Sequence, residues 1–577
     1  MNKRIISLIL CLVMLVACLA GCAQKTDDSR TNQINQDQFE MAMTLSMYLM
    51  CEEPVSAEQE IALEDEINSI LKGKFKTAVD LRFYTEEEYY TQLEKSFADR
   101  DAAAEAGTLR QEEELTEDIT YTDEYGITQI KYPTVEGYQV DIFYVGGYAK
   151  FAQYLADNRL AKLDEELSSA SKILNDYISP DYLTYLKKNS NGTYAIPNNT
   201  AIGEYTCLLL NKDVLAKTRY NTANGLKEFT SLTCDATKSI LEQVSTEHKE
   251  YVPLYSCLGA DGLALSGIKY WGVDEKGLFS DDFSLIMSSY NTEAKYGTEE
   301  SYMSSIINGL NNSAFKSQLK TLKSYKSSGY FGTEKDLEDG KVAVAYVKGG
   351  AELLDMYGEN YEVVVIQQPT LTTDDIYADM FAVSSTSQDL SRSMEILCHL
   401  NTDETFRNLL LYGIEGVNYE MVNSEYLDEN EDPYQVVRRI NNDYMMDEAK
   451  TGNTMLTYTL EGGDPTYKEY IKTQNLDAVV DITMGFTLTY DKYTVDMEQM
   501  QLIRQLSAEV LTKIEAITYE NFDTEYAALV TEYGSHDTVK PMLSMLEPTS
   551  EEEPASLSFL YNAWAEDIKI YIPEEEE

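Results

Sequence analysis

Hydrophobic and polar positions follow two different patterns along the first part of the chain. Apolar alternation or a short apolar run predicts a strand, and apolar residues three or four positions apart predict a helix. The elements predicted in this way are a strand, a helix, a strand and a helix, over residues 41–50, 58–71, 79–83 and 89–97. An acidic stretch over 102–138, rich in Thr and Gly, interrupts this order and is predicted to be a surface insertion.

After this stretch the pattern predicts strand–turn–helix units. The apolar run Val140–Val145 ends at Gly146 and Gly147, and a helix with one apolar face follows it. Repeated units of this kind predict a largely parallel sheet in an α/β fold. Further strands are predicted at 205–210, 341–347, 363–366 and 380–383, and long helices at 390–400 and 497–516. The chain beyond residue 387 is predicted to be mostly helical.

The beginning of the chain has the pattern of a secretory signal. Lys3 and Arg4 form a basic start, an apolar run follows, and the segment ends in Leu19-Ala20-Gly21-Cys22. These last four residues resemble the lipobox of bacterial lipoproteins. The resemblance implies that residues 1–21 are removed and that Cys22 is lipidated, with residues 22–38 as a polar tether. A transmembrane anchor would need about 20 apolar residues, more than this run provides.

Composition narrows the class of protein. Removal of the signal leaves roughly 555 residues, which is too long for one ordinary core and predicts two or more lobes. With 43% hydrophobic residues the chain has a globular composition, and its net charge of −53 disfavours nucleic acid, whose phosphates it would repel. The acids are spread over the whole chain, and they therefore predict a solvated acidic surface rather than a site for a cationic ligand.

Cysteine and histidine offer little for metal binding or catalysis. The cysteines beyond Cys22 are far apart, form no C-x-x-C pair and are predicted to be buried free thiols. They are Cys51, Cys207, Cys234, Cys257 and Cys398. The histidines lie on three separate segments, at His248, His399 and His536. The sequence therefore predicts no metal site, no cofactor and no catalysis that depends on histidine.

Six segments follow one another in an order that resembles a known family. They are Val140–Tyr148 with the following Asn158–Asp164, Tyr194–Pro197, Leu208–Asp213, Gly340–Tyr346, Phe381–Ser387 and Leu411–Tyr419. In this order they resemble the extracellular solute-binding proteins of bacterial ABC importers, in particular the carbohydrate-binding group that includes maltodextrin-binding proteins. The insertion at 102–138 departs from the pattern of that family.

The resemblance implies an α/β protein of two lobes, the type II periplasmic-binding-protein fold, with a ligand bound between the lobes. Ligands of open α/β sheets lie beyond the carboxyl ends of the strands, and closure of such proteins is a hinge motion. The implied division is lobe 1 over 39–206, lobe 2 over 207–383, lobe 1 again over 384–460, and a C-terminal helical part packed on lobe 2 over 461–577. The segment Phe381–Ser387 is expected to be the return crossing between the lobes.

A saccharide needs polar groups for its hydroxyl edge and aromatic rings for its apolar faces. In the first lobe this chemistry and the resemblance point to Tyr144, Tyr148, Asn198, Asn199, Glu204 and Tyr205. Glu204 stands seven residues before Asn211, a spacing similar to that of a ligand-binding acid in the maltodextrin group. The alternative for Glu204 is an exposed loop acid. Asp141, inside a buried strand, is predicted to be structural.

In the second lobe the candidate ligand residues are Tyr255, Trp271, Lys348 and Gly349. Pro253-Leu254-Tyr255 resembles the aromatic-bearing strand entry of the family, and Lys348-Gly349-Gly350 can present backbone N–H groups at a helix start. Trp271 is one of two tryptophans and either stacks on a ligand or anchors the core, the second role being favoured. Trp564 is predicted to lie in the core.

The resemblance implies a receptor that delivers a solute, expected to be a carbohydrate or oligosaccharide, to the permease subunits of an ABC transporter. We expect a lipid-anchored monomer at the extracellular face of the cell membrane, without cofactor or catalysis. A binding lipoprotein for a peptide, a polyamine or another solute is the main alternative. A secreted glycosidase or esterase and an adhesion protein whose lobes do not close are the others. The chain has no G-x-S-x-G, H-E-x-x-H or catalytic Cys/His signature.

Overall fold

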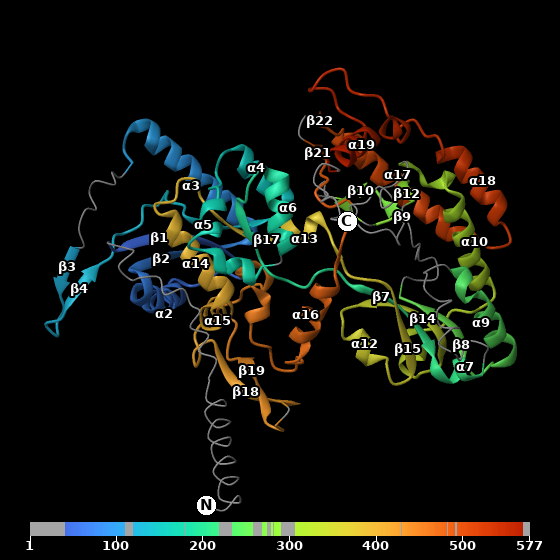
Figure 1. The fold of residues 1–577 in the computed structure, drawn as a ribbon, viewed down its shortest axis with the longest axis horizontal. Helices are drawn as coiled ribbons and strands as arrows, with labels where there is room; N and C mark the ends of the chain where they lie inside the picture. Colours follow the sequence, from blue (N-terminus) through green and yellow to red (C-terminus); the bar gives the residue numbers. More distant parts are fainter. Residues whose placement is uncertain are drawn as a thin grey trace, which may run out of the picture.

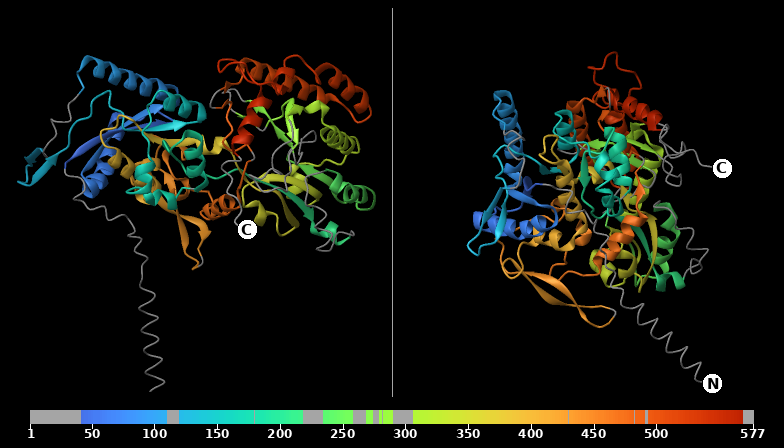
Figure 2. Two further views of the ribbon diagram at one scale, coloured as in Figure 1. Left: turned by 45° about the horizontal axis from the view of Figure 1, so that its top comes forward. Right: turned by 60° about the vertical axis from the view of Figure 1, so that its left-hand side comes forward.

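The computed structural model of the protein shows two lobes that lie side by side (Figure 1). It describes residues 41–109, 119–178, 180–217, 234–257, 268–273, 279–280, 282–289, 306–428, 430–481, 483–490 and 493–568. Figure 2 shows the same two bodies in two further views. Cys22, the predicted signal and the predicted tether lie outside the described residues. The side chain of Cys234 also lies outside the description.

The first lobe is built on a five-stranded sheet with the order β2-β1-β5-β17-β6. β1 is parallel to β2 and β5, whereas β17 runs antiparallel between β5 and β6. The strands are β1 Met43–Cys51, β2 Thr77–Thr85, β5 Ile142–Gly146, β6 Ala195–Pro197 and β17 Asp379–Val383. The prediction of a largely parallel sheet therefore holds for this lobe except at β17, which runs in the opposite direction to the other strands.

Helices pack on this sheet through faces on which apolar residues recur about every four positions. α2 begins at Ser56, whose hydroxyl accepts a hydrogen bond from Gln59 N and so satisfies a free donor of the first turn. The buried positions are Leu63, Ile67 and Leu71 in α2 and Tyr89, Leu93 and Phe97 in α3. Each such side chain contributes about 1.5–3 kcal/mol through burial. The helices of this lobe are α2 Ala57–Phe75, α3 Glu86–Ala106, α4 Tyr148–Ala156, α5 Asp164–Ser168, α6 Pro180–Ser190, α13 Thr373–Tyr377, α14 Leu390–Thr402 and α15 Glu404–Tyr412.

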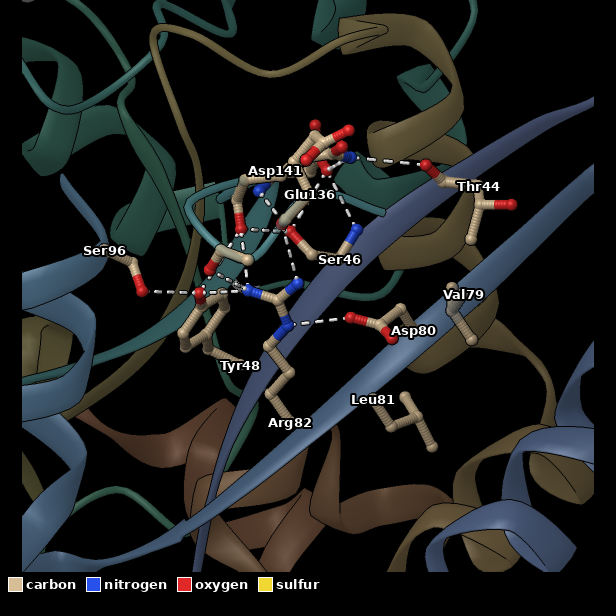
Figure 3. A network of polar contacts seen from close by, with 12 residues as sticks. Thr44, Ser46, Tyr48, Val79, Asp80, Leu81, Arg82, Ser96, Glu136 and Asp141 are labelled. Carbon is tan, nitrogen blue, oxygen red and sulfur yellow. Dashed lines mark hydrogen bonds and ion pairs between the residues drawn. The ribbon is translucent and has the colours of Figure 1, made fainter. Parts of the chain in front are cut away.

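A polar network inside the first lobe joins distant parts of the chain (Figure 3). The carboxylate of the fully buried Asp141 accepts hydrogen bonds from Ser46 N at 2.8 Å and from Gln388 N at 2.7 Å. Asp141 therefore has the structural role that its place in a buried strand predicts. The Arg82 guanidinium donates to the carbonyl of Glu136 at 3.0 Å and fixes the end of the 102–138 stretch. Within that stretch, β3 Ile119–Thr122 and β4 Thr128–Lys131 form an exposed hairpin that projects from the lobe (Figure 1).

The second lobe contains a four-stranded sheet with the order β15-β7-β14-β8. The prediction of a largely parallel sheet is wrong for this lobe, because β7 runs antiparallel to both β14 and β15 and only β14 and β8 are parallel. Side chains of β7 alternate between its faces: Leu208 and Leu210 belong to one apolar cluster, and Cys207 and Leu209 to the other. Both faces are covered, which explains the continuous apolar run in this strand. The elements are β7 Tyr205–Asn211, β8 Val252–Ser256, β14 Val342–Gly349, β15 Tyr361–Gln367, α7 Lys212–Ala216, α9 Cys234–Glu247, α11 Glu334–Glu338 and α12 Leu353–Met356.

A separate core joins the C-terminal helices to three short strands of the second lobe. α17 Met497–Ala516, α18 Phe522–Tyr533 and α19 Leu557–Ile568 pack with β9 Ile268–Tyr270, β12 Ile286–Ser289 and β13 Ile307–Asn308. α10, Ser313–Ser327, connects this core to the sheet, because Phe315 and Leu319 lie in the C-terminal cluster and Leu322 and Tyr325 in the sheet cluster. The remaining strands are β10 Gly272–Val273, β11 Phe279–Ser280, β18 Tyr419–Leu427, β19 Pro433–Arg439, β21 Thr489–Tyr490 and β22 Tyr493–Thr494.

Three crossing segments of the described chain run between the lobes and contact one another. They are residues 198–204 between β6 and β7, residues 368–378 between β15 and β17, and residues 478–487 after α16 Tyr467–Asp477. The second and third pair through β16 Thr370–Leu371 and β20 Val479–Val480. Gly203 has φ +50°, and a Cβ there would lie 2.7 Å from Thr370 N, so the close approach of two backbones requires glycine.

The strand pairing corrects the expected return crossing at Phe381–Ser387 and the boundary of lobe 2 at residue 383. β17 is hydrogen-bonded within the first sheet from Asp379 onward. The chain therefore returns to the first lobe before this strand. The sequence pattern did not reveal the difference because a crossing strand and a buried sheet strand are both short apolar runs.

Candidate functional site

The carboxyl ends of β1, β5 and β6 meet the start of β17 at one edge of the first sheet. Asp379 lies opposite Gly146 in the register of β17 and β5. Tyr144 Oη donates a hydrogen bond to Asp379 Oδ1 at 2.5 Å. Tyr144 is only 3% exposed, whereas Asp379 is partly exposed. Tyr144 therefore holds Asp379 in place, and Asp379 is the group that this edge presents.

Local charges and burial determine how this pair ionises. Burial raises the pKa of Asp379, and the nearby Asp447 raises it too, while the hydrogen bond from Tyr144 and the charge of Lys450 lower it. Burial and the proximity of Asp379 raise the pKa of Tyr144, so its hydroxyl remains a donor. A carboxylate held by a donor hydroxyl is suited to accept hydrogen bonds from ligand hydroxyl groups.

A short loop beside Asp379 brings further charged groups to this edge. Lys450 Nζ lies 3.5 Å from Glu86 Oε2 and 4.0 Å from Asp447 Oδ2. The fully buried Arg407 anchors the loop by donating to the carbonyl of Glu448 at 2.6 Å. Burial lowers the pKa of Arg407 to about 10, so the group stays cationic at neutral pH. Lys450 is thus neutralised by carboxylates on both sides.

Tyr90 and Tyr148 complete the first-lobe edge on either side of the glycine turn. Gly146 N donates to Tyr90 Oη at 3.0 Å, and burial raises the pKa of Tyr90 to about 12. The partly buried Tyr148 donates to Thr487 Oγ1 at 3.2 Å, and its ring packs edge-on against Tyr377 at 5.1 Å. The contact with Thr487 joins the first helix after the turn to the third crossing segment.

The second lobe presents an edge at the start of β7 and the end of β14. Glu204 and Lys348, both about half exposed, form an ion pair with Oε2 and Nζ 3.5 Å apart. Gly349 pairs with Tyr205 in the sheet register. Among the predicted residues, Glu204, Lys348 and Gly349 are therefore brought together. An ion pair this exposed contributes about 0–1 kcal/mol to stability.

Other predicted site residues are structural in this conformation. Tyr205 is 1% exposed and donates to Asp477 Oδ2 at 2.7 Å. Asn198 is 2% exposed and donates through Nδ2 to the carbonyl of Ala449 at 2.6 Å. The backbone carbonyl of Asn199 accepts a hydrogen bond from Thr454 N at 2.9 Å. These residues fix the crossing segment and the Lys450 loop, and only Asn199 of the three is partly exposed.

Trp271 and Tyr255 lie in packed regions instead of at the two edges. Trp271 is 1% exposed, its indole Nε1 donates to Ser288 Oγ at 2.8 Å, and its ring contacts Tyr561 at 4.8 Å. The role of core anchor is therefore correct and the stacking role is not. The predicted burial of Trp564 is also correct. Tyr255 packs, partly buried, against the apolar cluster on one face of the second sheet.

Sequence reasoning missed four groups at the first-lobe edge, Asp379, Tyr90, Asp447 and Lys450. Asp379 had a usable signal, because an acid directly before an apolar strand falls at the end of a sheet. Lys450 and Asp447 had none, since they lie in a loop that only tertiary packing brings to this edge. The predicted burial of the thiols holds for Cys51, Cys207 and Cys398 but not for Cys257, which is exposed.

A pocket of about 790 Å³ opens beside the loop after β1. It lies between residues 53–62 and the loop at 442–445, and its lining contains carboxylates and amides but no aromatic side chain. Within the described residues, no group of three or more His, Cys, Asp or Glu side chains is arranged to hold a metal ion. The first-lobe edge around Asp379 and the second-lobe edge around Glu204 and Lys348 are therefore the best candidate surfaces for a polar organic ligand.

No protein-family model and no curated protein sequence matches the chain. Among solved structures, it is similar to the N-glycan transport solute-binding protein NgtS of Streptococcus pneumoniae, with a TM-score of 0.50 and 18% identity over 91% of this chain and 99% of that one. An extracellular solute-binding protein from Bifidobacterium longum subsp. infantis covers 85% of this chain and 92% of its own, at 14% identity and a TM-score of 0.36. The sugar-binding protein MalE of Xanthomonas citri covers 85% and 96%, at 11% identity and 0.32.

At these identities the similarity concerns the fold, and the argument rests on the Streptococcus protein because the match spans nearly all of both chains. The match covers both the five-stranded and the four-stranded sheet in extent, because it spans 91% of this chain. The chain therefore has the two-lobe α/β fold of an extracellular solute-binding protein, as the order of its motifs predicted.

Proposed function

We propose that this protein is an extracellular receptor that binds a carbohydrate between its two lobes and delivers it to an ABC transporter. The observation that carries the proposal is the edge around Asp379, where a partly exposed carboxylate is held by the buried Tyr144 hydroxyl at 2.5 Å. A second polar edge, with Glu204 and Lys348, belongs to the other lobe. A ligand that contacts both edges favours the closed arrangement of the lobes.

The fold supports this proposal, and the charged side chains at the two edges limit the class of ligand. The solved structures similar to the chain are binding proteins, and the Streptococcus one is named for N-glycan transport. Among the described residues of the two edges, Lys450 and Lys348 each lie within 4.0 Å of a carboxylate, so neither edge shows an excess of positive charge that would favour an anionic ligand. Carboxylates, hydroxyls and aromatic rings together suit the hydroxyl edge and apolar face of a neutral sugar. Peptides and polyamines remain the alternatives that the test must separate.

A thermal-shift screen tests the proposal. Saturation with a bound ligand stabilises the folded state by about 2.7 kcal/mol at a concentration one hundred times Kd. We therefore expect at least one neutral oligosaccharide from a panel of maltotriose, mannotriose and chitotriose to raise Tm by about 2 °C or more. Spermidine and a tripeptide serve as controls. A rise with either control and with none of the sugars overturns the carbohydrate proposal.

Lipid anchoring at Cys22 is a separate part of the proposal. Acyl chains insert with about 0.8 kcal/mol per buried CH₂, and tethering keeps a receptor close to its transporter. In the described part of the chain, no helix is long and apolar enough to cross a membrane.

Cys22→Ala is expected to move the protein from the membrane fraction to the medium, or to leave it unprocessed, without changing saccharide affinity. Fractionation followed by mass spectrometry of the N-terminus measures the first effect, and calorimetry on the purified protein measures the second. Cys257→Ala, which removes an exposed thiol far from the N-terminus, is the matched control. If the Cys22→Ala protein remains membrane-bound and is fully processed, lipidation at this residue is wrong.

A further inference from the structure

Helix α16 carries a buried carboxamide that contacts both a crossing segment and the second lobe. Gln474 is 3% exposed, although it stands between exposed residues of this helix. Its Nε2 donates hydrogen bonds to the carbonyls of Ile202 at 3.0 Å and Gly203 at 2.6 Å. Its Oε1 accepts a hydrogen bond from Ala351 N at 3.1 Å. Both the nitrogen and the oxygen of the Gln474 side-chain amide therefore form hydrogen bonds.

These partners belong to two different functional segments. Ile202 and Gly203 lie in the first crossing segment, one residue before Glu204. Ala351 lies two residues after the end of β14, whose last residues are Lys348, the partner of Glu204, and Gly349. The Gln474 side chain therefore fixes the backbone on both sides of the exposed Glu204–Lys348 pair without being exposed itself.

The groups around the Gln474 side chain leave it little conformational freedom. A Cβ on Gly350 would lie 3.1 Å from Gln474 Oε1 and 2.3 Å from Glu352 Oε2, so the loop passes close to the amide. The neighbouring Asn475 donates to the carbonyl of Thr200 at 2.8 Å and accepts from Ile202 N at 2.8 Å. α16 is thus attached to the crossing segment at consecutive residues, and Gln474 also contacts the backbone after β14.

We propose that Gln474 is a positioning residue of the ligand site, which holds the loop at Gly350–Ala351, directly after Lys348 and Gly349 of β14, in a fixed relation to the first crossing segment. The loop then follows the hinge when the lobes move, and Lys348 and Gly349 reach a ligand in the orientation that closure requires. The inference rests on the proposed function, because it concerns the same site. It assigns Gln474 no contact with the ligand.

Two substitutions of Gln474 distinguish the role of its Nε2 donor from that of its Oε1 acceptor. Gln474→Met keeps the length of the side chain and removes all three hydrogen bonds. Gln474→Glu keeps an acceptor for Ala351 N but loses the two N–H donors to the carbonyls, and a protonated carboxyl restores one donor at acid pH. Leu476→Gln is the matched control, because Leu476 is 86% exposed on the same helix.

Hydrogen exchange of the full mature protein without ligand is the first measurement. Gln474→Met is expected to speed exchange of the Ala351 amide by at least tenfold, and Leu476→Gln to leave it unchanged. Calorimetry with maltotriose, mannotriose and chitotriose is the second, with affinity expected to fall about tenfold for Gln474→Met. The affinity of Gln474→Glu, expressed relative to that of the unaltered protein at the same pH, is expected to recover partly as the pH is lowered, a change that a general loss of stability does not produce.

The two measurements keep the inference distinct from the proposed function. If none of the three sugars binds the unaltered protein, the proposed function fails, and hydrogen exchange still decides whether Gln474 holds the loop. If sugars bind and Gln474→Met loses thermal stability with unchanged affinity and unchanged exchange at Ala351, the positioning role is wrong.

Discussion

Asp379→Asn is expected to weaken saccharide binding by about 10- to 100-fold, because a hydrogen bond to a charged group is worth about 1.5–3 kcal/mol. Asparagine has the same shape and keeps a carbonyl oxygen for the hydrogen bond from Tyr144, which is 2.5 Å long in the unaltered protein. The variant therefore removes the charge without leaving the buried Tyr144 hydroxyl unpaired. Isothermal calorimetry with the sugar that gives the largest thermal shift measures the change.

The pH dependence of binding gives the same prediction a second readout. Burial raises the pKa of Asp379, so the carboxylate of the unaltered protein becomes protonated sooner on acidification than a free one. Its affinity is expected to fall as the pH is lowered, and the affinity of Asp379→Asn is expected to lack this fall. Asp523→Asn, on an exposed acid of α18, is the control. Equal affinities of the Asp379→Asn and unaltered proteins at neutral pH would exclude Asp379 from the site.

Glu395→Gln is expected to stabilise the protein at about pH 8 by up to about 3 kcal/mol and to have no effect at about pH 4. Glu395 is 2% exposed in α14, and burial raises its pKa from 4.5 to about 7, with a further rise from Glu166. The folded state therefore keeps the proton at a pH where the unfolded state has lost it. Stability from this group is present below pH 4.5 and is lost as the pH rises through 7.

His399 in the same helix provides an internal reference, because its contribution to stability changes with pH in the opposite direction. Burial lowers its pKa from 6.5 to about 4, so its contribution is present above pH 6.5 and is lost as the pH falls toward 4. Urea unfolding between about pH 4 and pH 8 is expected to show a flatter alkaline side for Glu395→Gln, with the acid side unchanged. Curves that differ by a constant amount at every pH would mean that the substitution acts through packing and not through ionisation.

Elements with strong periodicity were predictable because their burial is set locally. The face of Tyr89, Leu93 and Phe97 in α3 is buried as its spacing predicts, and α17 has the predicted limits Met497–Ala516. In these segments the neighbouring residues alone decide which side faces the core.

Which strands become neighbours was decided by the tertiary structure. β17 reads as a short apolar run, and only its pairing with β5 and β6 reveals that the chain returns to the first lobe before Asp379. Trp271 is a similar case. Its sequence neighbourhood allows either a stacking or a core role, and contacts with Ser288 and Tyr561 make it part of the core.

The sequence by itself determined the α/β class, the order of most elements and the division into more than one lobe, because these depend on periodicity and chain length. It also placed Glu204 and Lys348 among the candidates, which the structure brings to 3.5 Å. The tertiary structure alone decided that Asp379 and Lys450 share an edge and that Gln474 joins the hinge to a loop. These residues are separated by tens to more than a hundred positions along the chain. Their proximity results from how the two sheets and three crossing segments pack, which local patterns do not encode.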